Sequence, residues 1–264
     1  MELNNESKTL FIPLQAKAKM SKKGLFLTDK KAEEIVNKIN SNLKNLKRSK
    51  WLSMFLSLRA LIIDELCNNF ILTNPKTTVI HLGCGLDSRC LRVNQNFKTW
   101  YDVDFESVID LRKEFYKTTS KYKMINSSVT DFSWMGKIEK TENILIIAEG
   151  LTMYLMEEEI KNLILEINKN FGKAYLIFDA YSKKAVKLSK IKNPVNKVKA
   201  KIKFGFNKPE EFLLLNPNLK FVKEHNIRKI NNGLTGFKKF IFNNLYCGKI
   251  SQSLYKIYEY NLKD

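Results

Sequence analysis

Apolar positions in the first 70 residues recur with the period of a helix. Between Lys50 and Phe70 they stand three or four residues apart, which places them on one side of a helix. Another amphipathic helix is predicted to begin at Thr28 or Asp29, because either side chain can cap its first turn. Asn74-Pro75 ends the pattern, since proline cannot continue a helix.

From Thr78 onward the apolar residues come in short runs separated by helical stretches. This alternation predicts a parallel sheet with helices on both faces. The predicted strands are 79–82, 99–104, 123–126, 143–149, 173–179, 219–226 and 253–262. The helices expected among them are 107–116, 157–171, one that begins after Pro209, and 235–249.

These elements predict one doubly wound α/β domain over residues 1–264, a length that one hydrophobic core can support. Within it we expect a helical N-terminal segment (1–75), a core (76–180), a cap insertion (181–218) and C-terminal strands with a helix (219–264).

Composition indicates the compartment of the protein and argues against several kinds of site. No run of 18 apolar residues occurs, so neither a membrane span nor a membrane partner is expected. Glu2 and Glu6 interrupt the N-terminus, which therefore does not resemble a signal peptide, and we expect a cytoplasmic protein. The spacing of cysteines and histidines also speaks against a zinc site or a disulfide framework. These residues are Cys67, Cys84, Cys90, Cys247, His81 and His225.

The formal net charge is +19, from 46 basic and 27 acidic residues. Such a charge is typical of nucleic-acid binding, but it also arises from a compositional bias toward lysine. The excess is spread along the chain, which favours the bias. Between Lys183 and Lys203 there are nine lysines and no acidic residue. This stretch is either a solvated face or a surface that attracts an anionic substrate.

The main candidate for ligand binding is the turn His81 to Arg89, with a Gly83-x-Gly85 spacing directly after a predicted strand. Glycine lets a ligand approach the backbone, although the same spacing also makes an ordinary tight turn. Ser88 stands where a dinucleotide fingerprint has its third glycine, which argues against NAD. S-adenosylmethionine has no phosphate and tolerates this departure.

Three carboxylates follow later strands. Asp104 lies 19 residues after Gly85 and could accept hydrogen bonds from ribose hydroxyls, with Asp102 as an alternative. Asp131 could bind an adenine amino group or cap a turn. Glu149 could hold the cofactor's ammonium group, orient the substrate or act as a general base. Close by, Tyr154 could line the acceptor pocket or pack in the core.

Several motifs occur together and in order along the chain. They are Thr9–Ala18, Arg59–Glu65, Gly83–Arg89, Trp100–Ile109, Ser128–Asp131, Ala148–Leu155 and Phe204–Glu211. Together they resemble the leucine carboxyl methyltransferase family, and above all its bacterial branch, which includes a polyketide O-methyltransferase. The resemblance implies a class I methyltransferase fold, which is Rossmann-like, with S-adenosylmethionine as cofactor.

The resemblance also implies residue roles. Arg59, 24 residues before Gly83, falls where the family has an arginine that pairs with the cofactor's carboxylate. Lys17 stands where relatives often have arginine. The implied cofactor site comprises Arg59, Gly83, Cys84, Gly85, Asp104, Val129, Thr130, Asp131 and Glu149. Glu149 and Tyr154 are the catalytic candidates, and Lys17, Tyr154 and Tyr181 are the substrate candidates.

The sequence therefore predicts an O-methyltransferase that acts on a carboxylate or hydroxyl of a small molecule, such as a polyketide-like natural product, by direct methyl displacement. The expected acceptor is anionic or phenolic, and a phenol would need Glu149 or a cap lysine as base. An RNA methyltransferase is an alternative that the charge suggests, but Ala148-Glu149-Gly150-Leu151 lacks the motif of base N-methylating enzymes. An NAD-dependent oxidoreductase and a non-catalytic binding protein are further alternatives.

Overall fold

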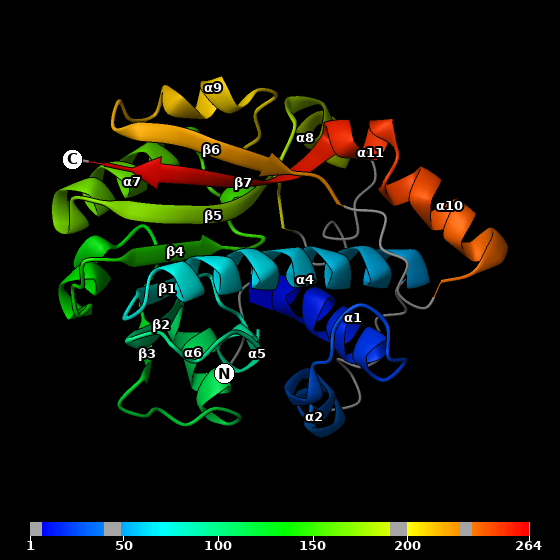
Figure 1. Ribbon diagram of the computed structural model, residues 1–264, viewed down its shortest axis with the longest axis horizontal. Coiled ribbons are helices and arrows are strands. Elements are labelled where there is room, and N and C mark those ends of the chain that lie inside the picture. The colour runs from blue at the N-terminus through cyan, green and yellow to red at the C-terminus, as the bar shows by residue number, and fades with distance from the viewer. Residues whose placement is uncertain (1–6, 40–48, 191–199, 228–233, 264) are drawn as a thin grey trace.

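A seven-stranded sheet forms the centre of the computed structural model, which describes residues 7–39, 49–190, 200–227 and 234–263 (Figure 1). The strand order is β3-β2-β1-β4-β5-β7-β6, in which β1 to β5 run parallel and β7 runs antiparallel to both of its neighbours. The strands are β1 (Thr78–Leu82), β2 (Thr99–Asp104), β3 (Tyr122–Asn126), β4 (Ile144–Ala148), β5 (Ala174–Tyr181), β6 (Leu219–His225) and β7 (Tyr255–Leu262).

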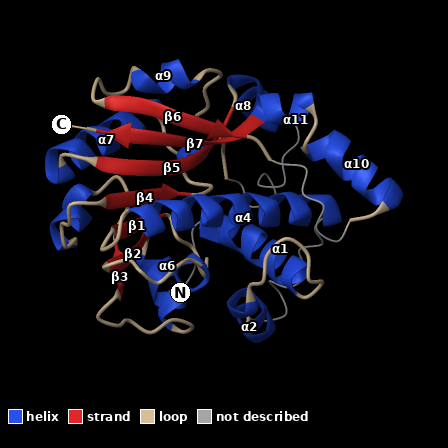
Figure 2. Ribbon diagram, in the orientation of Figure 1, coloured by secondary structure: helices blue, strands red, loops and turns tan. Residues whose placement is uncertain are grey.

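Helices cover both faces of this sheet (Figure 2). The α-helices are α1 (Phe11–Ser21), α2 (Lys30–Lys38), α4 (Lys50–Thr73), α5 (Arg89–Arg92), α6 (Glu106–Lys113), α7 (Glu157–Phe171), α8 (Lys183–Ser189), α9 (Pro209–Leu213), α10 (Gly236–Tyr246) and α11 (Lys249–Leu254). Short 3-10 helices are η1 (Ser7–Leu10), η2 (Phe132–Lys137) and η3 (Thr152–Tyr154).

Alternation along the strands divides the core into two layers. Val79 belongs to the cluster that α1, α2 and α4 cover, whereas Ile80 belongs to the cluster beneath α7 and α9. Neighbouring strand residues point to opposite faces, so a strand buried on both faces is apolar throughout. The predicted seven-stranded, mostly parallel α/β fold is confirmed.

Local chemistry explains where several helices begin. Asp29 caps α2 as predicted, because its Oδ1 accepts a hydrogen bond from the Ala32 amide at 2.8 Å. Ser182 caps α8 in the same way through the Ala185 amide, at 3.2 Å. The sequence analysis did not predict α8.

The chain after β6 differs from the prediction. The helix expected over 235–249 is two helices, α10 and α11, which meet at Gly248. A Cβ on this glycine would lie 2.5 Å from the carbonyl oxygen of Asn244 in the last turn of α10, so the path of the chain out of α10 requires glycine here. Because α11 continues to Leu254, β7 begins at Tyr255, where it pairs with Tyr181 at the end of β5.

Aromatic side chains tie the predicted cap segment to the sheet. Phe206 lies 4.7 Å from Tyr258 and 5.4 Å from Phe212 between ring centroids, and Phe204 is buried beside it. The predicted cap segment (181–218) contains residues 191–199, which lie outside the described ranges. Its boundaries therefore stay a prediction. No helix in the described ranges is both long and apolar enough to cross a bilayer.

Candidate active site

A cavity of about 290 Å³ lies at the carboxyl ends of β1, β2 and β4, under the N-terminal residues of η1 and α1. Ligands bind at this edge in open α/β sheets. Of the residues that the sequence predicts for the site, the cavity is lined by Lys17, Arg59, Gly83, Cys84, Gly85, Asp104, Val129, Thr130, Glu149, Tyr154 and Tyr181. These residues come from eight separate parts of the chain, so the fold assembles the predicted set in one place.

The turn after β1 takes a shape that glycine permits. Gly83 and Gly85 have φ angles of +62° and +52°, in the left-handed region. A Cβ on Gly85 would lie 3.2 Å from the Leu10 Cβ, so the N-terminal segment packs directly on the bare backbone. The turn therefore serves as one wall of the cavity. Between the two glycines, burial raises the pKa of the Cys84 thiol, which stays protonated.

The two candidate aspartates of β2 have different surroundings. Asp104 lines the cavity, and its Oδ2 accepts a hydrogen bond from the Gly85 amide at 2.8 Å. Asp102 is fully buried below it, where it forms an ion pair with Arg112 at 2.5 Å and accepts a hydrogen bond from Tyr122 at 2.6 Å. Of the two, Asp104 is the carboxylate that faces the cavity.

In the segment after β3, some of the predicted site residues line the cavity and one lies on the surface. Val129 and Thr130 line the cavity, whereas Asp131 is exposed and is not among the lining residues. The Asp131 carboxylate accepts a hydrogen bond from the Ser133 amide at 3.2 Å and so caps η2. The turn-capping alternative for Asp131 thus describes its observed contacts, and its role toward adenine stays a prediction.

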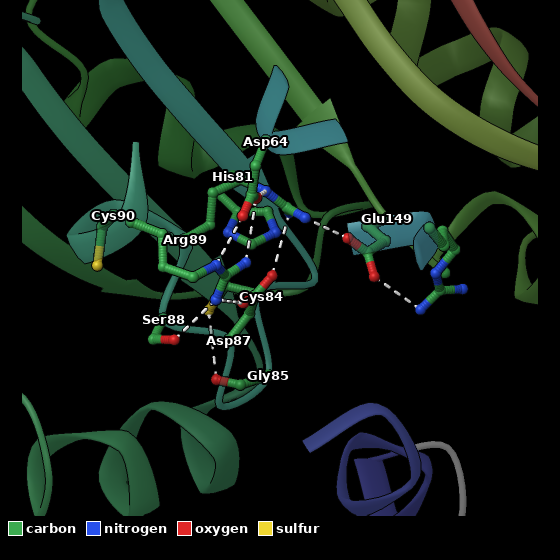
Figure 3. A network of polar contacts seen from close by, with 12 residues as sticks. Asp64, His81, Cys84, Gly85, Asp87, Ser88, Arg89, Cys90 and Glu149 are labelled. Carbon is green, nitrogen blue, oxygen red and sulfur yellow. Dashed lines mark hydrogen bonds and ion pairs between the residues drawn. The ribbon is translucent and has the colours of Figure 1, made fainter. Parts of the chain in front are cut away.

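Glu149 follows β4 and lies between two arginines. Its Oε1 is 2.7 Å from Arg59 Nη2, and its Oε2 accepts a hydrogen bond from Arg89. Figure 3 shows the Arg89 guanidinium held among Glu149, Asp64 and Asp87. Burial would raise the pKa of Glu149, but the charges of Arg59 and then Arg89 outweigh it and lower the pKa to about 2. The carboxylate therefore stays ionised and is a weak proton acceptor.

Arg59 projects from α4 toward two carboxylates. Besides Glu149, it binds Asp179 at the end of β5, with 3.0 Å between Nη1 and Oδ2. Asp179 also accepts hydrogen bonds from the Gly150 amide, at 2.6 Å, and from the Tyr255 hydroxyl. Arg59 Nε is buried without a hydrogen-bond partner among the described residues. A buried donor of this kind favours an anionic ligand at the site.

Two tyrosines and a lysine also line the cavity. Burial raises the pKa of both Tyr154 and Tyr181, so these phenols keep their protons. Lys203 also lines the cavity, and its backbone amide donates to the Met153 carbonyl at 2.7 Å. Its side chain is exposed, in contrast to Lys17, which is buried and pairs with Asp87 at 2.5 Å.

The sequence model of the leucine carboxyl methyltransferase family matches residues 10–168, which is more than half of the chain. The chain belongs to this family. It is an S-adenosylmethionine-dependent methyltransferase, and the predicted resemblance and cofactor are confirmed. This result sets aside the NAD-dependent oxidoreductase as an interpretation of the glycine turn.

Individual proteins agree with the family match. The chain is 28% identical over 226 residues to the tetracenomycin polyketide synthesis O-methyltransferase of Streptomyces glaucescens, and the match covers 85% of this chain and 84% of that protein. A solved methyltransferase structure from Anabaena variabilis superposes with a TM-score of 0.54 at 14% identity, covering 89% of this chain and 93% of that one. The magnesium protoporphyrin IX methyltransferase of Synechocystis, solved with S-adenosylhomocysteine, gives 0.52 at 11% identity, with 89% and 100% covered. These structures share the fold.

The ion pairs behind the cavity of this methyltransferase were not predicted from the sequence. Arg89 and Arg92 of α5 both bind Asp64 of α4, each with 2.6 Å between Nε and a carboxylate oxygen. Arg92 also reaches Asp87, the partner of Lys17, at 2.9 Å. An available indication was the presence of charged residues inside elements that are otherwise apolar, because buried charges require partners.

Proposed function

We propose that this methyltransferase transfers the methyl group to an oxygen atom of an anionic small molecule, with a carboxylate as the preferred acceptor. One observation carries the proposal: the cavity is lined both by the paired Arg59 and Glu149, which we call the inner end, and by the exposed Lys203 with Tyr154 and Tyr181, which we call the outer end. The name of the Streptomyces glaucescens relative, an O-methyltransferase of polyketide synthesis, supports an oxygen acceptor.

The inner end has the donor and acceptor groups that S-adenosylmethionine requires. Arg59, with its buried unpaired Nε, would hold the amino-acid carboxylate, and the ionised Glu149 would hold the ammonium group. Asp104 would accept hydrogen bonds from the ribose, while Gly83 and Gly85 leave room along the turn. When bound, the cofactor supplies a methyl group on a positively charged sulfur, which is a good leaving group.

The remaining cofactor candidates complete the same wall. Val129 and Thr130 would contact the adenine ring beside Cys84, since all three line the cavity. Asp131 would contribute only if its carboxylate left the cap of η2.

The proton chemistry of the site favours an acceptor that is already ionised. Glu149, with a pKa near 2, is a weak base, and Tyr154 and Tyr181 hold their protons. A carboxylate acceptor needs no base at neutral pH, whereas a phenol must lose a proton with a pKa near 10. The chain's contribution to catalysis is then to orient the acceptor and exclude water.

Lys203 is the cation best placed to attract that acceptor. Lys17 and Arg59 also line the cavity, but each already forms an ion pair with a buried carboxylate. The exposed ammonium group of Lys203 can bind a further anion. Tyr154 and Tyr181 would flank the acceptor with one ring and one hydroxyl each.

Two measurements test this function separately. Calorimetry with S-adenosylhomocysteine tests the inner end, and the protein should bind it with a Kd in the micromolar range, roughly 1–100 μM. Transfer of a labelled methyl group to a panel of aromatic acids, aliphatic acids and phenols tests the acceptor. We expect methyl esters of the acids as the main products. Exclusive methylation of phenols, amines or tRNA would overturn the proposed acceptor while leaving cofactor binding intact.

A further inference from the structure

Helix α10 presents apolar side chains to solvent. Phe237 and Phe240 are 74% and 63% exposed, and their rings stack with centroids 6.4 Å apart. Three residues apart, they share one side of the helix. On another side, Phe242 is buried and packs on Phe26 and Trp51, at 6.0 and 6.3 Å between centroids. The helix is thus anchored by one aromatic side chain and displays two others.

Neighbouring helices also expose apolar side chains. Helix α11 contacts both α10 and α8, and Figure 1 shows α11 between the other two helices. Ile250 on α11 is 76% exposed, and Leu188 on α8 is 47% exposed. We call Leu188, Phe237, Phe240 and Ile250 the apolar patch. Single exposed apolar residues are ordinary, but four on three contacting helices indicate an interaction site.

The parts of the sequence that carry the apolar patch are rich in basic residues. Residues 182–208 contain ten lysines and no acidic residue, and residues 225–258 contain six lysines and arginines, again with no acidic residue. Among them, Lys184, Lys187 and Lys249 are exposed on α8 and α11. The chain's net charge of +19 opposes association with a second copy of itself. An anionic partner with an apolar layer matches both properties of the surface.

We propose that the apolar patch and its lysines bind the surface of an anionic lipid bilayer. The phenyl, isoleucine and leucine side chains enter the boundary between headgroups and acyl chains, and Lys184, Lys187 and Lys249 contact lipid phosphates. RNA fits this surface less well, because Ile250 and Leu188 offer no ring for base stacking. The inference concerns the outer face of α8, α10 and α11, and it stands independently of the methyl acceptor.

The test is co-sedimentation of the full chain with phosphatidylcholine vesicles that either contain or lack phosphatidylglycerol. We expect the partition coefficient to be about tenfold higher on the anionic vesicles and to fall as salt is raised. The double variant Phe237→Ser/Phe240→Ser should lower it about tenfold or more, and Lys184→Glu/Lys187→Glu by a similar factor.

Matched controls place the same changes elsewhere on the surface. Leu214→Ser removes a leucine that is 84% exposed just after α9, and Lys117→Glu/Lys121→Glu reverses two exposed charges after α6. Both controls should bind vesicles nearly as the parent chain does, and circular dichroism should show that all variants fold. Equal binding to neutral vesicles would overturn the proposal, as would unchanged binding of the phenylalanine variant. Salt-dependent tRNA binding without vesicle binding, or a dimer that Phe237→Ser/Phe240→Ser dissociates, would overturn it in favour of those partners.

Discussion

The inner and outer ends of the cavity lining differ in burial and in ion pairing. At the inner end, Glu149 is buried between Arg59 and Arg89, and each arginine has a further carboxylate partner. At the outer end, Lys203 is exposed, and Tyr154 and Tyr181 are only partly buried. Fixed ion pairs suit a cofactor of constant structure, because preorganised groups do not have to rearrange on binding. Under the proposed function, the outer end can change its acceptor through a few side chains without disturbing that framework.

The largest expected effect comes from removing a charge at the inner end. Arg89→Met leaves Asp64, Asp87 and Glu149 short of a counter-charge in a buried place, and should lower the free energy of unfolding by about 3–5 kcal/mol. Urea denaturation measures the loss. Lys113→Met is the control, since its ion pair with Asp110 is exposed and should be worth less than about 1 kcal/mol. Equal losses in the two variants would contradict a special role for the buried pairs.

Cofactor affinity should respond next most strongly. Arg59→Lys keeps the positive charge but loses the planar guanidinium group with its several N–H donors. Asp104→Asn removes the anionic acceptor for ribose hydroxyls. Each should weaken S-adenosylhomocysteine binding by about 10- to 100-fold in calorimetry. Asp110→Asn, a half-buried aspartate on α6 that does not line the cavity, serves as the control. If both site variants stay folded and bind as tightly as the parent chain, the proposed cofactor contacts are wrong.

The same contrast predicts a pH dependence of stability. The pKa of Glu149 is lowered to about 2 from an ordinary 4.5, so the native state resists its protonation while the unfolded state does not. The stabilisation from Glu149 is therefore complete above about pH 4.5 and is lost as pH falls toward 2, with a slope of at most about 1.4 kcal/mol per pH unit. Glu149→Gln should show a correspondingly flatter decline in this window in acid-urea titrations. A parallel decline in both proteins would show that Glu149 is not held ionised.

Much of the fold follows from local patterns in the sequence. Strands such as Ile144–Ala148 are apolar throughout because both of their faces are covered, and Asp29 caps a helix through its own side chain. The split at Gly248 was not predictable, because it depends on the distance between this backbone and the Asn244 carbonyl.

The candidate site was predictable where motif and strand end coincide, as at Gly83, Asp104 and Glu149. Their partners were not, since the ion pairs join residues such as Arg59 and Asp179 that are 120 positions apart. Sequence spacing likewise could not decide between Asp102 and Asp104, which lie on the same side of β2. Depth in the fold separates them, because Asp102 lies beside Arg112 and Asp104 lies at the cavity.

The smallest expected effect tests the outer end alone. Lys203→Met should raise the KM for a carboxylate acceptor about fivefold, as expected for loss of one exposed charge contact of about 1 kcal/mol, and should leave kcat and the Kd of S-adenosylhomocysteine unchanged. Lys201→Met removes an exposed neighbouring charge that does not line the cavity, and it should leave all three values as they are. A neutral ester of the same acid, tested as an inhibitor, should bind both variants equally. If Lys203→Met instead weakened cofactor binding, the two ends of the cavity would not be separable, and the contrast between a fixed inner end and an adaptable outer end would fail.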